Sequence, residues 1–176
     1  MKGGRYIQYI RPMRTRFWAA VALFLIHGAC YPLMPAAALK RSTDGSSWML
    51  LCVGVAFWVT LLGAWAMVIA ANSCRRAYAR SRLKGDLRMG RRPGILSFFS
   101  TLPGTVADAA FAAALIAFVI LYLTGKINSF VSYYLLAVLS ISGNLHGMFN
   151  GRIYHTIIKT KRKSNPTKNS EERQPQ

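Results

Sequence analysis

The chain has 176 residues, of which 53% are hydrophobic, and its formal net charge at pH 7 is +18. It contains 23 Lys and Arg residues but only five Asp and Glu residues. So few carboxylates argue against acid-base catalysis by paired acidic side chains. The long apolar stretches are incompatible with a disordered chain, and they are long enough to cross a lipid bilayer.

The basic residues are distributed unevenly along the sequence. Twenty of them fall in three segments, which are residues 1–16, 73–94 and 152–176. The two connectors around Lys40 and Lys126 carry the remaining three. Loops rich in Lys and Arg remain in the cytoplasm. The sequence therefore predicts a multi-pass protein of the inner or plasma membrane, with both termini cytoplasmic and both connectors outside.

Four apolar segments alternate with these loops, so the predicted fold is all-α with a bundle of four transmembrane helices. A helix needs roughly 20 residues to cross a hydrocarbon core of about 30 Å. Continuous apolar runs favour helices over barrel strands. Pro32 and Pro35 are expected to break the first helix at its outer end. The predicted spans are residues 17–39, 48–72, 104–124 and 128–151.

These spans place residues 1–158 in one transmembrane domain. The polar, charged residues 159–176 contain almost no apolar side chains, which predicts a disordered basic cytoplasmic tail.

The third span is preceded by a segment that is expected to form a short interfacial helix around Phe98 and Phe99, because Pro103-Gly104 separates it from the crossing. Thr105 is then predicted to cap the third transmembrane helix, with Asp108 at its third position. An ionisable residue at membrane depth is also a functional candidate. Asp108 is thus either a helix cap or the partner in a salt bridge to the cytoplasmic basic residues, or it is a proton- or cation-handling group with His146.

The fourth span has one face of small and polar residues, and Leu145, Met148 and Phe149 cover the opposite face. Polar groups in hydrocarbon need partners, and glycines at intervals of four residues allow close helix approach. This face is expected to pack within the protomer, to form an oligomer contact, or to line a polar pathway. Its members are Ser140, Gly143, Asn144, His146, Gly147, Asn150, Gly151 and Tyr154.

No catalytic, metal or cofactor site is predicted. The only other intramembrane histidine is His27, and no carboxylate lies at helical ligand spacing from it. The sequence contains neither a nucleophile-base motif nor a glycine-rich phosphate loop. We therefore expect that the protein is not an enzyme.

The second cytoplasmic loop provides a concentrated basic surface. Such a surface fits anionic lipid headgroups or an acidic cytoplasmic protein. Nucleic acid is disfavoured because aromatic side chains are not interleaved with the basic ones. The basic residues are Arg75, Arg76, Arg80, Arg82, Lys84, Arg88, Arg91 and Arg92.

Three functions are compatible with this pattern. The first is a homo-oligomeric membrane anchor or sensor that recruits or restrains an acidic cytoplasmic partner. The second is a small channel or pore-forming effector, and the third is an immunity protein against a pore-forming toxin. The size and plan are similar to membrane components of bacterial anti-phage defence systems and to membrane-embedded immunity proteins, although many unrelated proteins share this plan.

Overall fold

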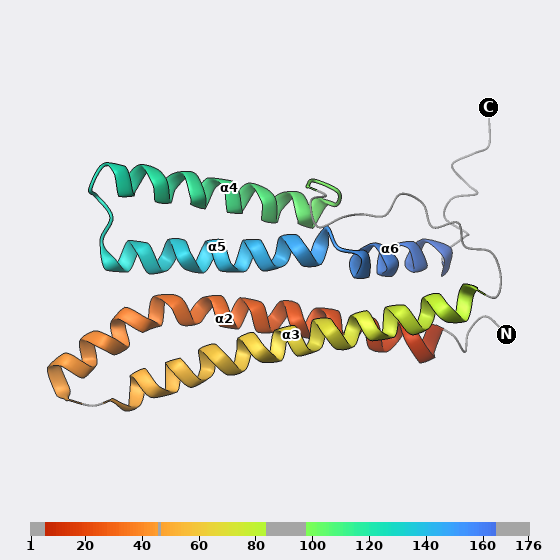
Figure 1. Ribbon diagram of the computed structural model, residues 1–176, viewed down its shortest axis with the longest axis horizontal. Helices are drawn as coiled ribbons and strands as arrows, with labels where there is room; N and C mark the ends of the chain where they lie inside the picture. Colours follow the sequence, from red (N-terminus) through yellow and green to blue (C-terminus); the bar gives the residue numbers. More distant parts are fainter. Residues whose placement is uncertain (1–5, 46, 84–97, 165–176) are drawn as a thin grey trace.

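A computed structural model of the chain describes residues 6–45, 47–83 and 98–164, and these residues form helices without strands (Figure 1). The prediction of an all-helical chain is confirmed for this part of the sequence. A short π-helical segment is followed by five α-helices. The elements are η1 (Tyr6–Ile10), α2 (Arg11–Asp44), α3 (Trp48–Leu83), α4 (Leu102–Leu123), α5 (Ser129–Phe149) and α6 (Arg152–Ser164).

Three helical segments in the described part are long and apolar enough to cross a membrane, namely Gln8–Asp44, Trp48–Arg80 and Leu102–Leu123. They agree with the first three predicted spans. Helix α5 is not among them, and its second half carries Asn144 and His146. The chain is therefore compatible with a membrane protein.

The long helices pack in a defined order. Helix α4 packs on α5, α5 packs on α2, and α2 packs on α3 (Figure 1). Extensive contact between α3 and α4, which would close a four-helix ring, is not present among the described residues. The helices thus form an open row, α4–α5–α2–α3, in which α3 and α4 are the outer members.

Helices α2 and α3 are much longer than their predicted spans, with 34 and 36 residues. At about 1.5 Å per residue they extend over roughly 51 and 54 Å, well beyond a hydrocarbon core of about 30 Å. The predicted break at Pro32 and Pro35 was wrong, because α2 continues through both prolines to Asp44. It bends near that end instead (Figure 1), as expected where prolines remove backbone hydrogen bonds.

The main apolar core lies where the beginning of α2, the end of α3, the end of α5 and α6 meet. Phe17 is fully buried there, and its ring stacks on Tyr154 at 5.5 Å and meets Phe149 edge-on at 5.7 Å. Met148 and Phe149 are buried in the same cluster. The apolar face of α5 is therefore packed against protein rather than left outward. Helix α6 contributes Ile157 to this core and continues to Ser164, into the segment predicted to be a disordered tail.

Candidate functional site

The start of α4 differs from the predicted start. Thr101 is the N-cap, and its hydroxyl accepts a hydrogen bond of 3.2 Å from the backbone N–H of Gly104. Pro103 occupies the first turn, where its missing N–H costs nothing. The predicted cap at Thr105 was wrong, because the Thr-Leu-Pro-Gly sequence that begins at Thr101 places the cap four residues earlier. Phe98 and Phe99 lie in a turn, and the rest of the predicted interfacial helix falls outside the described residues.

Asp108 lies two turns into α4 and is 6% exposed. Its Oδ2 accepts a hydrogen bond of 2.8 Å from the backbone N–H of Phe99. Phe99 has a φ of 54°, in the left-handed region, so the chain folds back before the helix and presents this N–H to the carboxylate. Asp108 therefore stabilises the turn that precedes α4, although it is not at the third helical position.

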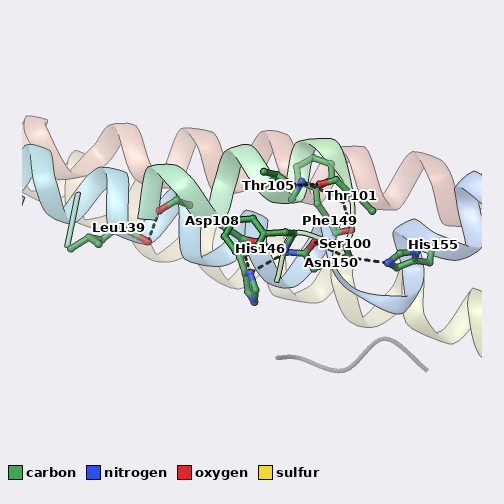
Figure 2. A network of polar contacts seen from close by, with 12 residues as sticks. Ser100, Thr101, Thr105, Asp108, Leu139, His146, Phe149, Asn150 and His155 are labelled. Atoms are coloured by element: carbon green, nitrogen blue, oxygen red, sulfur yellow. Dashed lines mark hydrogen bonds and ion pairs between the residues drawn. The ribbon is translucent and has the colours of Figure 1, made fainter. Parts of the chain in front are cut away.

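Asp108 also joins α4 to α5. Its Oδ1 lies 2.5 Å from Nδ1 of His146, and the Asn150 side-chain amide donates to both carboxylate oxygens at 3.2 and 3.3 Å (Figure 2). Asn150 Nδ2 is also 3.1 Å from His146 Nδ1, across one helical turn. His146 and Asn150 of the fourth span and the carboxylate of the third thus form one cluster.

Asn150 extends this cluster toward α6. Its Oδ1 accepts hydrogen bonds from the hydroxyl of Ser100 at 2.7 Å and from the Ser100 backbone N–H at 3.3 Å. The same hydroxyl lies 3.3 Å from Nε2 of His155 on α6 (Figure 2). We call Ser100, Asp108, His146, Asn150 and His155 the polar network. It connects the turn before α4 with α5 and α6.

Gly104 makes this approach possible. A Cβ atom on Gly104 would collide with the side-chain amide of Asn150. Asn150 itself is 1% exposed and is the C-cap of α5. Gly151 follows, and a Cβ there would collide with the backbone of α5. Gly104 therefore allows the end of α5 to pack against α4, and Gly151 allows α6 to begin directly after α5.

Within the described residues, each buried side-chain nitrogen or oxygen has a hydrogen-bond partner. Groups of three or more His, Cys, Asp and Glu residues that could hold a metal are absent from this part of the chain. A buried carboxylate with a full set of donors is strongly held, and removing a partner is costly. The polar network is thus suited to fixing helix positions.

The remaining residues of the predicted small polar face do not share one environment. Gly143 faces the ring of Phe111 on α4, where an added Cβ would lie 3.5 Å from it. Asn144 donates to the carbonyl of Ser140 in its own helix at 2.8 Å. Gly147 has open space around it, and Tyr154 lies beyond the helix break and packs on Phe17. Tyr154 departs from this face because α5 stops at Phe149 instead of continuing.

His27 is 2% exposed and belongs to the contact between α2 and α3. Its Nδ1 lies 3.1 Å from the carbonyl oxygen of Phe57, and its ring contacts those of Tyr31 and Phe57. These contacts satisfy the imidazole inside the protein, away from the polar network.

The predicted basic surface is only partly described. Arg75, Arg76 and Arg80 lie on the last turns of α3, whereas Lys84, Arg88, Arg91 and Arg92 fall outside the described residues, as does the environment of the Arg82 side chain. Sequence patterns did not identify Arg16, which donates to the Ala70 carbonyl at 3.3 Å and to the Cys74 sulfur at 2.8 Å. They also missed Ser100 and Thr101, although a hydroxyl residue followed closely by a proline is a helix-start signal.

No protein-family model, curated protein or solved structure matches the chain.

Proposed function

We propose that the protein is a non-catalytic, oligomeric component of the inner or plasma membrane, which recruits or restrains an acidic cytoplasmic protein through a basic cytoplasmic face. The observation that carries this proposal is the position of the basic residues at helix ends, beyond the membrane-length apolar stretches of the sequence. Arg11 and Arg14 begin α2, Arg80 lies near the end of α3, and Lys159 lies on α6. The start of α2, the end of α3 and α6 are packed together.

This basic end has an apolar interior of its own. Tyr78 on α3, Ile157 on α6 and Met13 on α2 are buried in the main core. A folded unit can hold its surface charges in fixed positions, and this favours a specific partner over a purely diffuse attraction. The end of α2 and the end of α4, by contrast, lie at the opposite end, where the two hairpins turn (Figure 1).

The proposal includes α5 as a fourth crossing, with both chain termini in the cytoplasm. Helix α5 has 21 residues and packs between α4 and α2. Its polar residues His146 and Asn150 bond to Asp108 inside the protein, which lowers the cost of placing them at membrane depth. The three basic segments alternate with two connectors that carry few basic residues, and this alternation supports the same orientation.

The channel alternative has less support. His146 and Asn150 would have to line a pathway, yet both are engaged with α4. The immunity-protein alternative stays open because it requires only a membrane-embedded surface. Gly147, with open space beside it, is a position where another copy could approach closely, and it supports the oligomeric part of the proposal.

Membrane orientation can be tested by cysteine labelling in intact cells. A single cysteine at Ser46 is expected to react with a membrane-impermeant thiol reagent, while one at Ser164 is not. The native cysteines are replaced first, and lysed cells serve as the accessibility control. The opposite labelling pattern would refute the cytoplasmic assignment of the basic end.

Recruitment can be tested by affinity capture of the tagged protein in mild detergent. Charge reversal at Arg80, Arg82 and Arg88 is expected to abolish co-purification of an acidic protein while leaving insertion intact, because the other basic segments still specify orientation. Capture should weaken between low and physiological salt, where screening acts over about 8 Å. Absence of any partner, together with ion flux through liposomes that Asn144→Leu removes, would favour the channel.

A further inference from the structure

Three arginines come together where α3 passes the start of α6. Arg75 and Arg76 are consecutive on α3, and Arg152 is the first residue of α6. The two helices are in contact, and Arg75 lies close enough to Arg76 and Arg152 for their positive charges to repel. Bringing guanidinium groups together is unfavourable unless an anion lies among them.

The described part of the chain does not supply this anion. Its acidic side chains are Asp44, at the far end of α2, and Asp108, which is bonded within the polar network. The first turn of α6 contains no acidic residue. Because Arg152 is the first residue of α6, the positive end of the α6 dipole lies in the same region as the guanidinium groups.

Arg75 is held in place for binding. It is half-buried, and its Nε donates to the side-chain oxygen of Asn72 at 3.0 Å. A guanidinium has five N–H donors, so this contact leaves its two terminal nitrogens available. These nitrogens match the spacing of two phosphate oxygens. Arg16 on α2 already donates to the Ala70 carbonyl oxygen and to the sulfur of Cys74, the residue before Arg75.

The depth of the cluster identifies the source of the phosphate. The apolar part of α3 runs from Trp48 to Ala71, about 36 Å of helix, which slightly exceeds a hydrocarbon core of about 30 Å. Arg75 lies one turn further on, at the level of lipid headgroups. Helix α5 ends at Phe149, and α6 begins three residues later at Arg152. If α5 crosses the membrane, the start of α6 also lies at the level of the headgroups.

We propose that Arg75, Arg76 and Arg152 form a binding site for the phosphate group of an anionic membrane lipid. The site rests on the proposed embedding of the helices in a bilayer, but it does not require a protein partner. A bound headgroup neutralises the cluster and ties α6 to the membrane surface. The basic residues further along α6 and in the second loop remain available to a cytoplasmic protein.

The site can be tested by native mass spectrometry of the full-length protein in mild detergent. Short-chain phosphatidylglycerol, which is anionic, is titrated against phosphatidylcholine, which has no net charge. Wild-type protein should retain phosphatidylglycerol preferentially. The double variant Arg75→Gln/Arg152→Gln should lower the apparent affinity for the first phosphatidylglycerol by about tenfold, as expected when charge-assisted hydrogen bonds are lost.

The matched control is Lys40→Gln/Arg41→Gln, which removes the same charge from exposed positions near the other end of α2. Its affinity should change by less than about twofold, since these side chains lie away from the three arginines. Equal weakening in both double variants would overturn the site and leave only diffuse attraction. Thermal unfolding of both variants is measured in parallel, and Arg75→Lys provides a charge-preserving variant that loses two-pronged phosphate recognition.

Two further arms examine the ligand itself. If inorganic phosphate bound as tightly as the lipid and with the same arginine dependence, the lipid assignment would be overturned. If a polyglutamate peptide bound through these arginines while the lipid did not, the site would belong to an acidic protein. The lipid titrations contain no cytoplasmic protein, so a failure of the recruitment test at Arg80, Arg82 and Arg88 would not affect them. An inverted pattern of cysteine labelling would instead remove the premise that these arginines lie at the cytoplasmic membrane surface.

Discussion

The α4–α5 hairpin is joined by a buried carboxylate and its hydrogen-bond partners, whereas the α2–α3 hairpin is joined mainly by apolar and aromatic side chains. In the first, Asp108 meets His146 and Asn150. In the second, Phe24 meets Trp65 edge-on at 5.8 Å, and Cys30, Ala37 and Val53 form a smaller apolar cluster. Lipid competes well for apolar surfaces but offers no partners to polar groups. Polar contacts should therefore fix the position of α4 more strictly than apolar contacts fix that of α3.

The largest expected effect is on the α4–α5 hairpin. Asp108→Ala removes the acceptor for the Phe99 N–H and for the Asn150 amide, and it should destabilise the protein by about 3–5 kcal/mol, as is typical when one member of a buried pair is lost. Denaturant unfolding in mild detergent measures this change. Asp44→Ala, at an exposed position on α2, is the control. Equal stability of the two variants would show that the network does not hold the hairpin.

A smaller effect is expected in the main core. Phe17→Leu keeps an apolar side chain but loses the ring contacts with Trp18, Phe149 and Tyr154. Each aromatic pair contributes about 0.5–1.5 kcal/mol beyond simple burial, and we expect a loss of about 2 kcal/mol in the same assay. Phe130→Leu, at a half-exposed position on α5, should change stability by about 0.5 kcal/mol or less. A larger effect at Phe130 would place an unseen partner on that face.

The smallest effects separate two glycines. Gly28→Ala places a methyl group where the outer atoms of Ile141 lie, and because that side chain can rotate away, the cost should be about 1 kcal/mol. Gly147→Ala enters open space and should change the stability of a single chain by about 0.5 kcal/mol or less. Mass measurement in detergent checks the assembly state. Loss of an oligomer in Gly147→Leu without unfolding would locate a contact between copies at this glycine, whereas an unchanged oligomer would exclude it.

The helices of this protein could be predicted from sequence because long apolar runs leave few alternatives in lipid. The positions of the first three spans follow from hydropathy and charge. The hydrophobic pattern gave less information about helix ends. Pro32 and Pro35 were expected to end α2, but the helix continues through them, and Thr101 rather than Thr105 begins α4.

Sequence by itself determined the all-helical class, the apolar segments and the concentration of charge, because these depend on local composition. It also singled out Asp108, His146 and Asn150 as polar residues that need partners at membrane depth. Only the tertiary structure decided that these three meet one another, that Ser100 and His155 extend the network to α6, and that Met148 and Phe149 belong to the core. The physical reason is that hydrogen bonds between helices depend on how the helices are rotated and staggered. Those positions follow from packing between residues far apart in the chain, such as Gly104 against Asn150 and Gly28 against Ile141.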